Sequence, residues 1–181
     1  TVIYEEARVT LFEEGCTVKA QAIKDMPVVS MADGTKIGNV QELLFDTSTW
    51  RLAALLLTAG GGGSLLPFEA VRSFGNDVIT VENVAATQGT EGNAAAGNLR
   101  GLKDLAGLRV INGEGSWLGD VRDVELAVKD GAVEQISVRK GGMLGLGGTN
   151  TSIPAAAIRG IGPKVMTVDV PVAAPGSPAT S

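Results

Sequence analysis

Two segments of the chain share one pattern, Asp33-Gly-Thr-Lys-Ile-Gly-Asn-Val-Gln-Glu-Leu-Leu-Phe-Asp46 and Glu114-Gly-Ser-Trp-Leu-Gly-Asp-Val-Arg-Asp-Val124. They align when the chain is shifted against itself by 81 residues. Further along, the shift grows to 87, so that Pro67 falls on Pro154 and Ile79 on Met166. The six extra residues lie within 141–149, where a surface loop accommodates them. Two aligned blocks in the same order predict a duplicated module.

Each copy has the pattern of short β-strands. Side chains alternate between apolar and polar over 36–40 and 117–121, and the next strands are expected at 52–57 and 132–138. Asp130-Gly131 between two apolar runs is typical of a β-hairpin turn. After each proline we expect one helical turn, at 69–72 and 155–158, followed by a strand at 77–82 and 164–169. The pattern predicts an all-β fold with two tandem small β-barrels.

The expected boundaries follow from these blocks. The first barrel is predicted at 24–84 and the second at 103–170. Residues 85–102 are rich in Ala, Gly, Thr and Asn and are predicted to be a flexible linker, while 171–181 should be a disordered tail. Residues 1–23 match neither copy and stay unassigned, with either a strand or a short helix possible there. The sequence leaves open whether the barrels pack together.

The composition argues against several classes of function. The chain has no histidine, which removes the commonest general base and metal ligand. Its single cysteine, Cys16, cannot form an internal disulfide or a cysteine-based metal cluster. The net charge of −5 disfavours a protein that neutralises phosphates, and no apolar run is long enough to span a bilayer. We therefore expect a cytoplasmic protein that is not an enzyme, needs no cofactor or metal and does not insert into a membrane.

Two further patterns have plain structural interpretations. The glycine-rich stretches at 60–63 and 141–148 are followed by strand-like residues rather than a helix, so we interpret them as hairpin loops and not phosphate-binding loops. Acidic residues occur along the expected strands and are interpreted as a solvated strand face: Glu42, Asp46, Asp120, Asp123 and Glu125.

Seven residues are candidates for contact with a partner. Trp50 aligns with the turn glycine Gly131, and Trp117 aligns with Lys36, so both indoles are expected to face solvent or to cover a neighbouring part of the chain. Met143, Leu144 and Leu146 lie in the long loop and either fold over a barrel end or form an adaptable apolar patch. Arg139 and Lys140 adjoin that loop and are suited to an acidic partner.

The aligned segments resemble the PRC-barrel domain. The resemblance rests on 33–46 with Leu66-Pro-Phe-Glu-Ala-Val-Arg-Ser-Phe-Gly75, and on the more divergent 114–124 with Ile153-Pro154 and 158–162. This family is known for the cytoplasmic domain of the photosynthetic reaction-centre H subunit and the C-terminal domain of a ribosome maturation factor. In both, the barrel is a protein-binding module. The resemblance therefore implies an interaction module with PRC-type barrels.

Three hypotheses of function follow. The first is a non-enzymatic adaptor or scaffold that binds a macromolecule, a protein rather than a nucleic acid. The second is association with RNA or the ribosome, suggested by the ribosome-maturation relative and the more basic second copy. The third is a structural protein linked with stress, as some members of the resembled family are. The sequence does not indicate an oligomeric state or a particular partner.

Overall fold

The computed structural model describes residues 16–59, 62–89, 99–141 and 148–170, and it is an all-β fold with two similar halves. The first half contains β1 (Thr17–Lys19), α1 (Ala20–Ile23), β2 (Pro27–Ser30), β3 (Lys36–Asp46), β4 (Arg51–Ala59), β5 (Gly62–Pro67), η2 (Phe68–Ala70), β6 (Val71–Phe74), β7 (Ile79–Val81), η3 (Val84–Ala86) and β8 (Gln88–Gly89). The second contains β9 (Leu99–Gly101), α2 (Leu102–Leu105), β10 (Arg109–Asn112), β11 (Trp117–Ala127), β12 (Val133–Lys140), β13 (Thr149–Pro154), η5 (Ala155–Ala157), β14 (Ile158–Ile161) and β15 (Val165–Val168).

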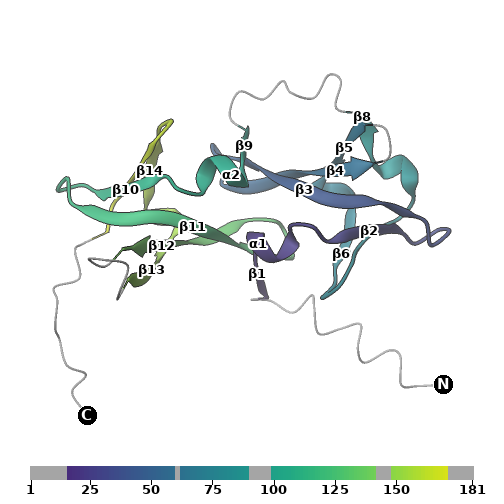
Figure 1. The fold of residues 1–181 in the computed structure, drawn as a ribbon, viewed down its shortest axis with the longest axis horizontal. Helices are drawn as coiled ribbons and strands as arrows, with labels where there is room; N and C mark the ends of the chain where they lie inside the picture. Colours follow the sequence, from purple (N-terminus) through teal and green to yellow (C-terminus); the bar gives the residue numbers. More distant parts are fainter. Residues whose placement is uncertain (1–15, 60–61, 90–98, 142–147, 171–181) are drawn as a thin grey trace, which may run out of the picture.

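Each half is built on one curled sheet, and the two sheets lie end to end in an elongated molecule (Figure 1). The first sheet has the order β6-β7-β2-β3-β4-β5-β8, and the second has the order β13-β12-β11-β10-β15-β14. The equivalent long strands β3 and β11 lie at their centres. The glycine-rich stretches connect the antiparallel pairs β4–β5 and β12–β13, which confirms their interpretation as hairpin connections.

The duplication begins earlier in the chain than the sequence comparison indicated. β1, α1 and β2 correspond to β9, α2 and β10 with a shift of 82 residues, whereas β3 and β11 differ by 81. The turn before β3 is one residue longer than the turn before β11, so a fixed shift of 81 misses the match. Asp25 and Gly107, at equivalent positions, both have positive φ. The statement that 1–23 matches neither copy is therefore wrong for Thr17–Ile23.

Two other local predictions are also corrected. The stretch 85–102 was predicted to be a flexible linker, but its described ends contain β8 and β9. The helical turn expected at 69–72 is a 3-10 turn at Phe68–Ala70, and the strand β6 follows at once. The second copy behaves in the same way, with η5 followed by β14. Residues 90–98 and 171–181, predicted as linker and tail, lie outside the described residues.

The two repeats exchange their first strands. β1 of the first repeat pairs with β11 of the second, in the register Val18 with Leu126. β9 of the second repeat pairs with β3 of the first, in the equivalent register Arg100 with Phe45. The short helices follow their strands, so that α1 contacts β11 and α2 contacts β3 near the centre of the molecule (Figure 1). The exchange is reciprocal, as in a two-fold symmetric dimer fused into one chain.

The β3–β4 and β11–β12 turns meet at the centre of this arrangement. The backbone N–H of Leu52 donates to the carbonyl of Gly131 at 2.8 Å, and the N–H of Val133 donates to the carbonyl of Trp50 at 2.8 Å. Arg51 and Ala132 form an isolated antiparallel bridge between them. Because Leu52 and Val133 are equivalent, the two hydrogen bonds are related by the same approximate two-fold axis. Main-chain hydrogen bonds thus join the repeats directly.

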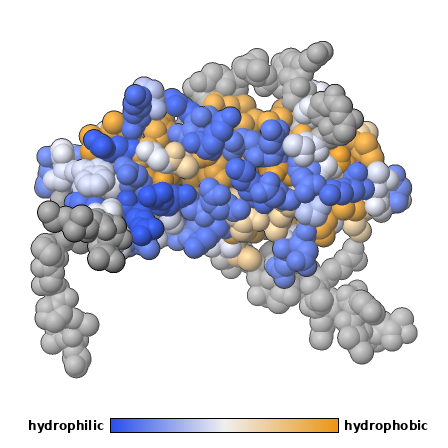
Figure 2. All heavy atoms as spheres, viewed as in Figure 1, coloured by the Kyte–Doolittle hydropathy of each residue, from blue (hydrophilic) through white to orange (hydrophobic). Residues whose placement is uncertain are grey.

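The buried side chains of both repeats belong to one hydrophobic core. Ile23 of α1 and Leu105 of α2 are fully buried, which places each exchanged helix inside the shared core. Figure 2 shows hydrophilic residues across the middle of the face in view, with hydrophobic residues above them and toward the right end. Among the described residues, the large apolar side chains with the greatest exposure are Met31 in the turn after β2, Val84 in η3 and Trp117 at the start of β11.

We expect the fragment of residues 98–174 to form a homodimer. In that fragment β1, which pairs with β11, and β3, which pairs with β9, are missing. Because β9 is equivalent to β1, β9 of one copy can take the place of β1 and pair with β11 of a second copy. Size-exclusion chromatography with light scattering measures the mass. A fragment that begins at residue 102 lacks β9 and should not form this dimer. A folded monomer of residues 98–174 would contradict the exchange.

Candidate partner-binding site

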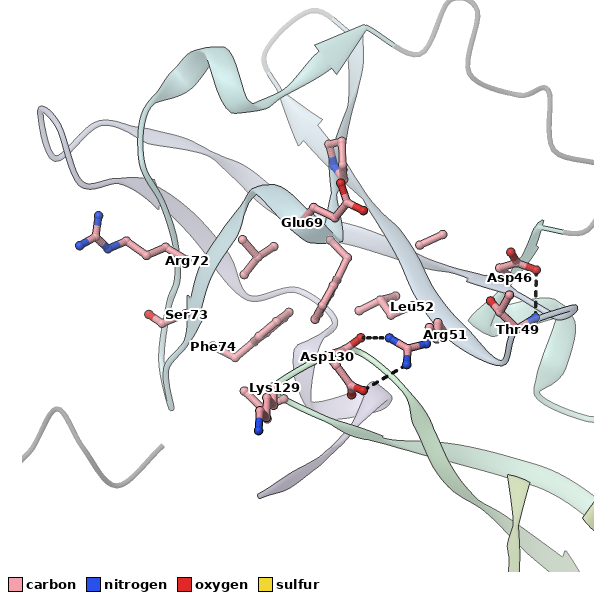
Figure 3. Close-up of a pocket in the computed structure, with 15 residues that line it drawn as sticks. Asp46, Thr49, Arg51, Leu52, Glu69, Arg72, Ser73, Phe74, Lys129 and Asp130 are labelled. Atoms are coloured by element: carbon pink, nitrogen blue, oxygen red, sulfur yellow. Dashed lines mark hydrogen bonds and ion pairs between the residues drawn. The ribbon is translucent and has the colours of Figure 1, made fainter. Parts of the chain in front are cut away.

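A groove of about 660 Å³ lies where the two repeats meet, and we call it the junction groove (Figure 3). One wall is β6 with the preceding turn, and the opposite wall is formed by the β3–β4 turn and by the β11–β12 turn of the second repeat. Its apolar lining comprises Leu52, Ala53, Pro67, Phe68, Val71, Phe74 and Val128. Its polar lining includes Asp46, Arg51, Glu69, Arg72, Lys129 and Asp130. Both repeats therefore contribute to the groove.

The position of Phe68 depends on a glycine of the other repeat. Gly131 has a φ of 68°, and a Cβ atom at this position would lie 3.0 Å from Cζ of the Phe68 ring. The ring of Phe68 also stacks on that of Phe74, with 5.9 Å between the centroids. A glycine is favoured at position 131 for two reasons: it adopts the positive φ of the turn without strain, and it has no Cβ atom to collide with the Phe68 ring. The aromatic pair forms an apolar wall of the groove.

Ion pairs hold the charged side chains at the rim of the groove. Nη2 of Arg51 lies 3.3 Å from Oδ2 of Asp130, and Nη1 donates to the Asp130 carbonyl, also at 3.3 Å (Figure 3). Arg72 pairs with Glu82. The Asp46 carboxylate accepts hydrogen bonds from the hydroxyl and the backbone N–H of Ser48, which lower the pKa of Asp46 below its ordinary value. The rim therefore presents both signs of charge.

The wall formed by β6 is a sheet edge. β6 pairs with β7 through Val71–Val81 and Phe74–Ile79, and it stands at the end of the strand order. On its other side, no strand of the described residues pairs with it. Val71, Arg72, Ser73 and Phe74 all line the junction groove. A sheet edge along a groove with an apolar wall can accept an additional extended strand through main-chain hydrogen bonds.

Of the two alternatives for Trp50, the structure fits the one in which the indole covers a neighbouring part of the chain. Its φ of 51° matches the left-handed conformation of Gly131, the equivalent residue, so the alignment of these two turns is correct. Its indole is half-buried and packs against the shared core. The residue equivalent to Phe68 is Ala155, which also packs against the core. The first repeat therefore has a large residue at both positions, Trp50 and Phe68, and the second repeat has a small one at both, Gly131 and Ala155. This arrangement favours a packing role for Trp50.

Trp117 is exposed, as expected from its alignment with Lys36. Its relative exposure is 37%, and it lies on the second repeat at the start of β11. Nζ of Lys140 lies 5.3 Å from the ring centroid and donates a hydrogen bond of 3.0 Å to the Trp117 carbonyl. The guanidinium of Arg109 lies 5.8 Å from the same ring. The structure thus brings together two predicted residues, Trp117 and Lys140, with Arg109, which the sequence comparison had not singled out.

The other predicted residues separate into two groups. Arg139 is exposed beside Lys140 at the end of β12, and it pairs in register with Asp120 of β11. Met143, Leu144 and Leu146 lie outside the described residues. None of the four predicted residues that the structure describes, Trp50, Trp117, Arg139 and Lys140, lines the junction groove. The groove residues were missed because they come together only through the contact of the two repeats.

Two carboxylates expected on a solvated face have structural roles instead. Glu42 is only 8% exposed, and its Oε1 accepts hydrogen bonds from the N–H of Leu43 and of Lys103, the second residue of α2. At the equivalent position, Oδ1 of Asp123 accepts from Val124 and from Gln21 in α1. Each carboxylate therefore binds the N-terminus of the helix exchanged from the other repeat. A β-bulge next to each residue breaks the simple alternation of side chains.

The described residues contain neither a cluster of metal-ligating side chains nor a helix that could span a membrane. Within residues 16–59, 62–89, 99–141 and 148–170, no three of His, Cys, Asp and Glu lie grouped as metal ligands would. Of the helices in the same ranges, none has the length and apolar character needed to cross a bilayer.

Comparison with known families agrees with the repeat seen in the structure. The model of the PRC-barrel domain matches the chain twice, over residues 17–88 and 98–174, which together make up most of its length. The chain belongs to the PRC-barrel family. The identification as a tandem PRC-barrel protein is thereby confirmed, and the matched ranges begin at β1 and just before β9. Comparison with curated proteins finds no match. PRC-barrel domains are generally binding or scaffold domains without catalytic activity.

The exchange between the PRC-barrel repeats predicts a specific pH dependence. Burial raises the pKa of Asp123 above its ordinary value of 3.8, against the opposing effect of its two N–H donors. The folded protein therefore binds this proton more tightly, and the free energy of unfolding falls as pH rises from the ordinary pKa through the raised one. Asp123→Asn keeps an oxygen that accepts the two hydrogen bonds, but its side chain does not titrate, so this decrease in the free energy of unfolding is absent from the variant. Denaturant unfolding between pH 3.5 and 7 should show the variant gaining stability relative to the native chain, and parallel curves would contradict this.

The two tryptophans of the PRC-barrel repeats should differ in their effect on stability. Trp50→Ser removes a half-buried indole from the shared core and should lower the free energy of unfolding by about 2 kcal/mol. Trp117→Ser removes an exposed indole and should cost no more than about 1 kcal/mol. Denaturant titration of both variants measures the difference. Equal losses would mean that Trp50 does not have the packing role described above.

Proposed function

We propose that this tandem PRC-barrel protein is a non-enzymatic adaptor that binds an extended segment of a protein partner in the junction groove. The observation that carries the proposal is the open edge of β6, which runs along a groove of about 660 Å³ with an apolar wall and a charged rim. A partner strand added to this edge forms main-chain hydrogen bonds with β6. Its alternate side chains then reach the wall made by Phe68 and Phe74.

The groove is favourable for binding because its walls are already fixed. The stack of Phe68 on Phe74 and the ion pair of Arg51 with Asp130 hold four lining side chains in place. Less side-chain entropy is lost when a ligand binds to side chains that are already ordered. Figure 3 shows Leu52 and Phe74 near the centre of the groove, with Arg72 and Lys129 at its margin. A segment with apolar residues at alternate positions fits this lining.

A protein partner fits the junction groove better than RNA. The polar lining includes three acidic and three basic side chains, and the acidic ones would repel phosphate groups. The net charge of the chain is −5, whereas RNA binding draws much of its affinity from the neutralisation of phosphates. Apolar walls beside a sheet edge are typical of peptide recognition. We therefore place RNA association second for this groove.

The proposal is tested with a substitution that fills the groove. Ala53 lines it, and Ala53→Arg introduces a long side chain into the space that the partner would occupy. Peptides are first selected from a random displayed library on the native protein, and their affinities are then measured by calorimetry. We expect Ala53→Arg to weaken binding by at least about tenfold, a change of about 1.4 kcal/mol. Hydrogen exchange of β6 should slow when peptide binds.

The second repeat provides a matched control. Glu134 of β12 is equivalent to Ala53 of β4 but is exposed, so Glu134→Arg places the same side chain away from the groove. This control should keep the native affinity within about twofold. Thermal unfolding checks that both variants fold. If no peptide is selected, or if both variants bind the selected peptides equally, the groove is not the binding site.

A further inference from the structure

A second surface of the protein differs between the two repeats in a way that the shared fold does not require. It surrounds Trp117 and comprises Arg109, Trp117, Arg139, Lys140 and Lys164, which we call the cationic cluster. The equivalent residues of the first repeat are Pro27, Lys36, Thr58, Ala59 and Asp77. The cluster carries four positive charges, whereas its equivalents carry one positive and one negative. Since the first repeat folds without them, these cations are not needed for the barrel.

The cluster extends from the indole along one side of the second repeat. Arg109 lies over the Trp117 ring and also lines a pocket of about 600 Å³ together with Lys164. The backbone N–H of Arg109 donates to the Lys164 carbonyl at 3.1 Å, which fixes the two residues side by side. Asp104 and Asp120 line the same pocket. With these two carboxylates included, the surface has a net charge of +2 on a chain of net charge −5.

Contacts with the backbone and with the indole hold two cations of the cluster, Lys140 and Arg109, in position. Gly119 has a φ of 139°, and a Cβ atom there would lie 2.7 Å from the backbone carbonyl carbon of Arg139. Because residue 119 is a glycine, the backbone of Arg139 and Lys140 at the end of β12 can lie close to β11. The hydrogen bond from Lys140 to the Trp117 carbonyl then holds the ammonium beside the ring. Cations that are already held lose less entropy when they bind an anion.

We propose that the cationic cluster binds an acidic peptide segment of a partner. Carboxylates of the segment pair with Lys140 and Arg109, and its apolar atoms rest on the exposed part of Trp117. A nucleic acid suits the surface less well, because its phosphates follow one another without interruption and some would lie against Asp104 and Asp120, whereas a peptide can place its carboxylates at Lys140 and Arg109 and neutral residues beside the two aspartates. The site is separate from the junction groove, and none of its residues lines that groove. Two sites would allow one protein to hold two segments.

The test uses fluorine NMR of the full chain labelled with 5-fluorotryptophan. The chain has two tryptophans, so Trp117→Phe assigns the two resonances. The probe is a glutamate-rich peptide of about 12 residues, with a lysine-rich peptide and a single-stranded RNA of similar length as comparisons. We expect the acidic peptide to shift the Trp117 resonance and leave that of Trp50 in place. The affinity should fall as salt is added.

Charge-matched variants separate the cluster from general electrostatics. The double variant Arg109→Gln and Lys140→Gln should weaken binding of the acidic peptide by at least about tenfold. The control, Lys36→Gln with Arg159→Gln, removes the same charge at exposed sites outside the cluster and should stay within about twofold. Absence of a Trp117 shift, equal losses in both variants, or tighter binding of RNA would each overturn the proposal. Ala53→Arg should leave this binding unchanged, so failure here is distinguishable from failure of the groove.

Discussion

Two short strand pairings that cross between the repeats determine the rest of this structure. β1 completes the edge of β11, and β9 completes the edge of β3, so each long strand has main-chain partners from both repeats. Without the exchange, these edges would carry unpaired N–H and C=O groups. The pairings also bring α1 and α2 to the carboxylates of Asp123 and Glu42 and bury Ile23 and Leu105 in the shared core. A single core then replaces two small ones that would be marginal alone.

The sequence predicted the duplication and most strands of each copy, because glycine, proline and apolar residues recur at fixed spacing. It failed where geometry departs from a fixed period. One extra residue in the turn before β3 hid the match of Thr17–Ile23 with the second copy. A bulge turned Glu42 inward beside Leu43, although strict alternation assigns them to opposite faces. The exchange itself leaves no local signal, since β1 is equally compatible with β3 and β11.

The candidate sites were harder to predict, for a related reason. The junction groove joins Phe68 and Phe74 to Gly131 and Val128 of the other repeat, and no spacing along the chain indicates that contact. Trp117 was recognised because Lys36 occupies its position in the first copy. Arg109 was missed since β10 had not been identified as a strand. The repeats thus share a barrel, while the differences between them produce both surfaces proposed for partners.

The exchange is tested most directly by NMR contacts between backbone protons of paired strands. If the repeats exchange their first strands, nuclear Overhauser effects will connect Val18 with Leu126 and Arg100 with Phe45. If each repeat instead keeps its own first strand, the contacts will connect Val18 with Phe45 and Arg100 with Leu126. A sample that mixes labelled and unlabelled chains shows that the contacts lie within one molecule. The structure predicts the first set, and observation of the second would contradict the reciprocal exchange.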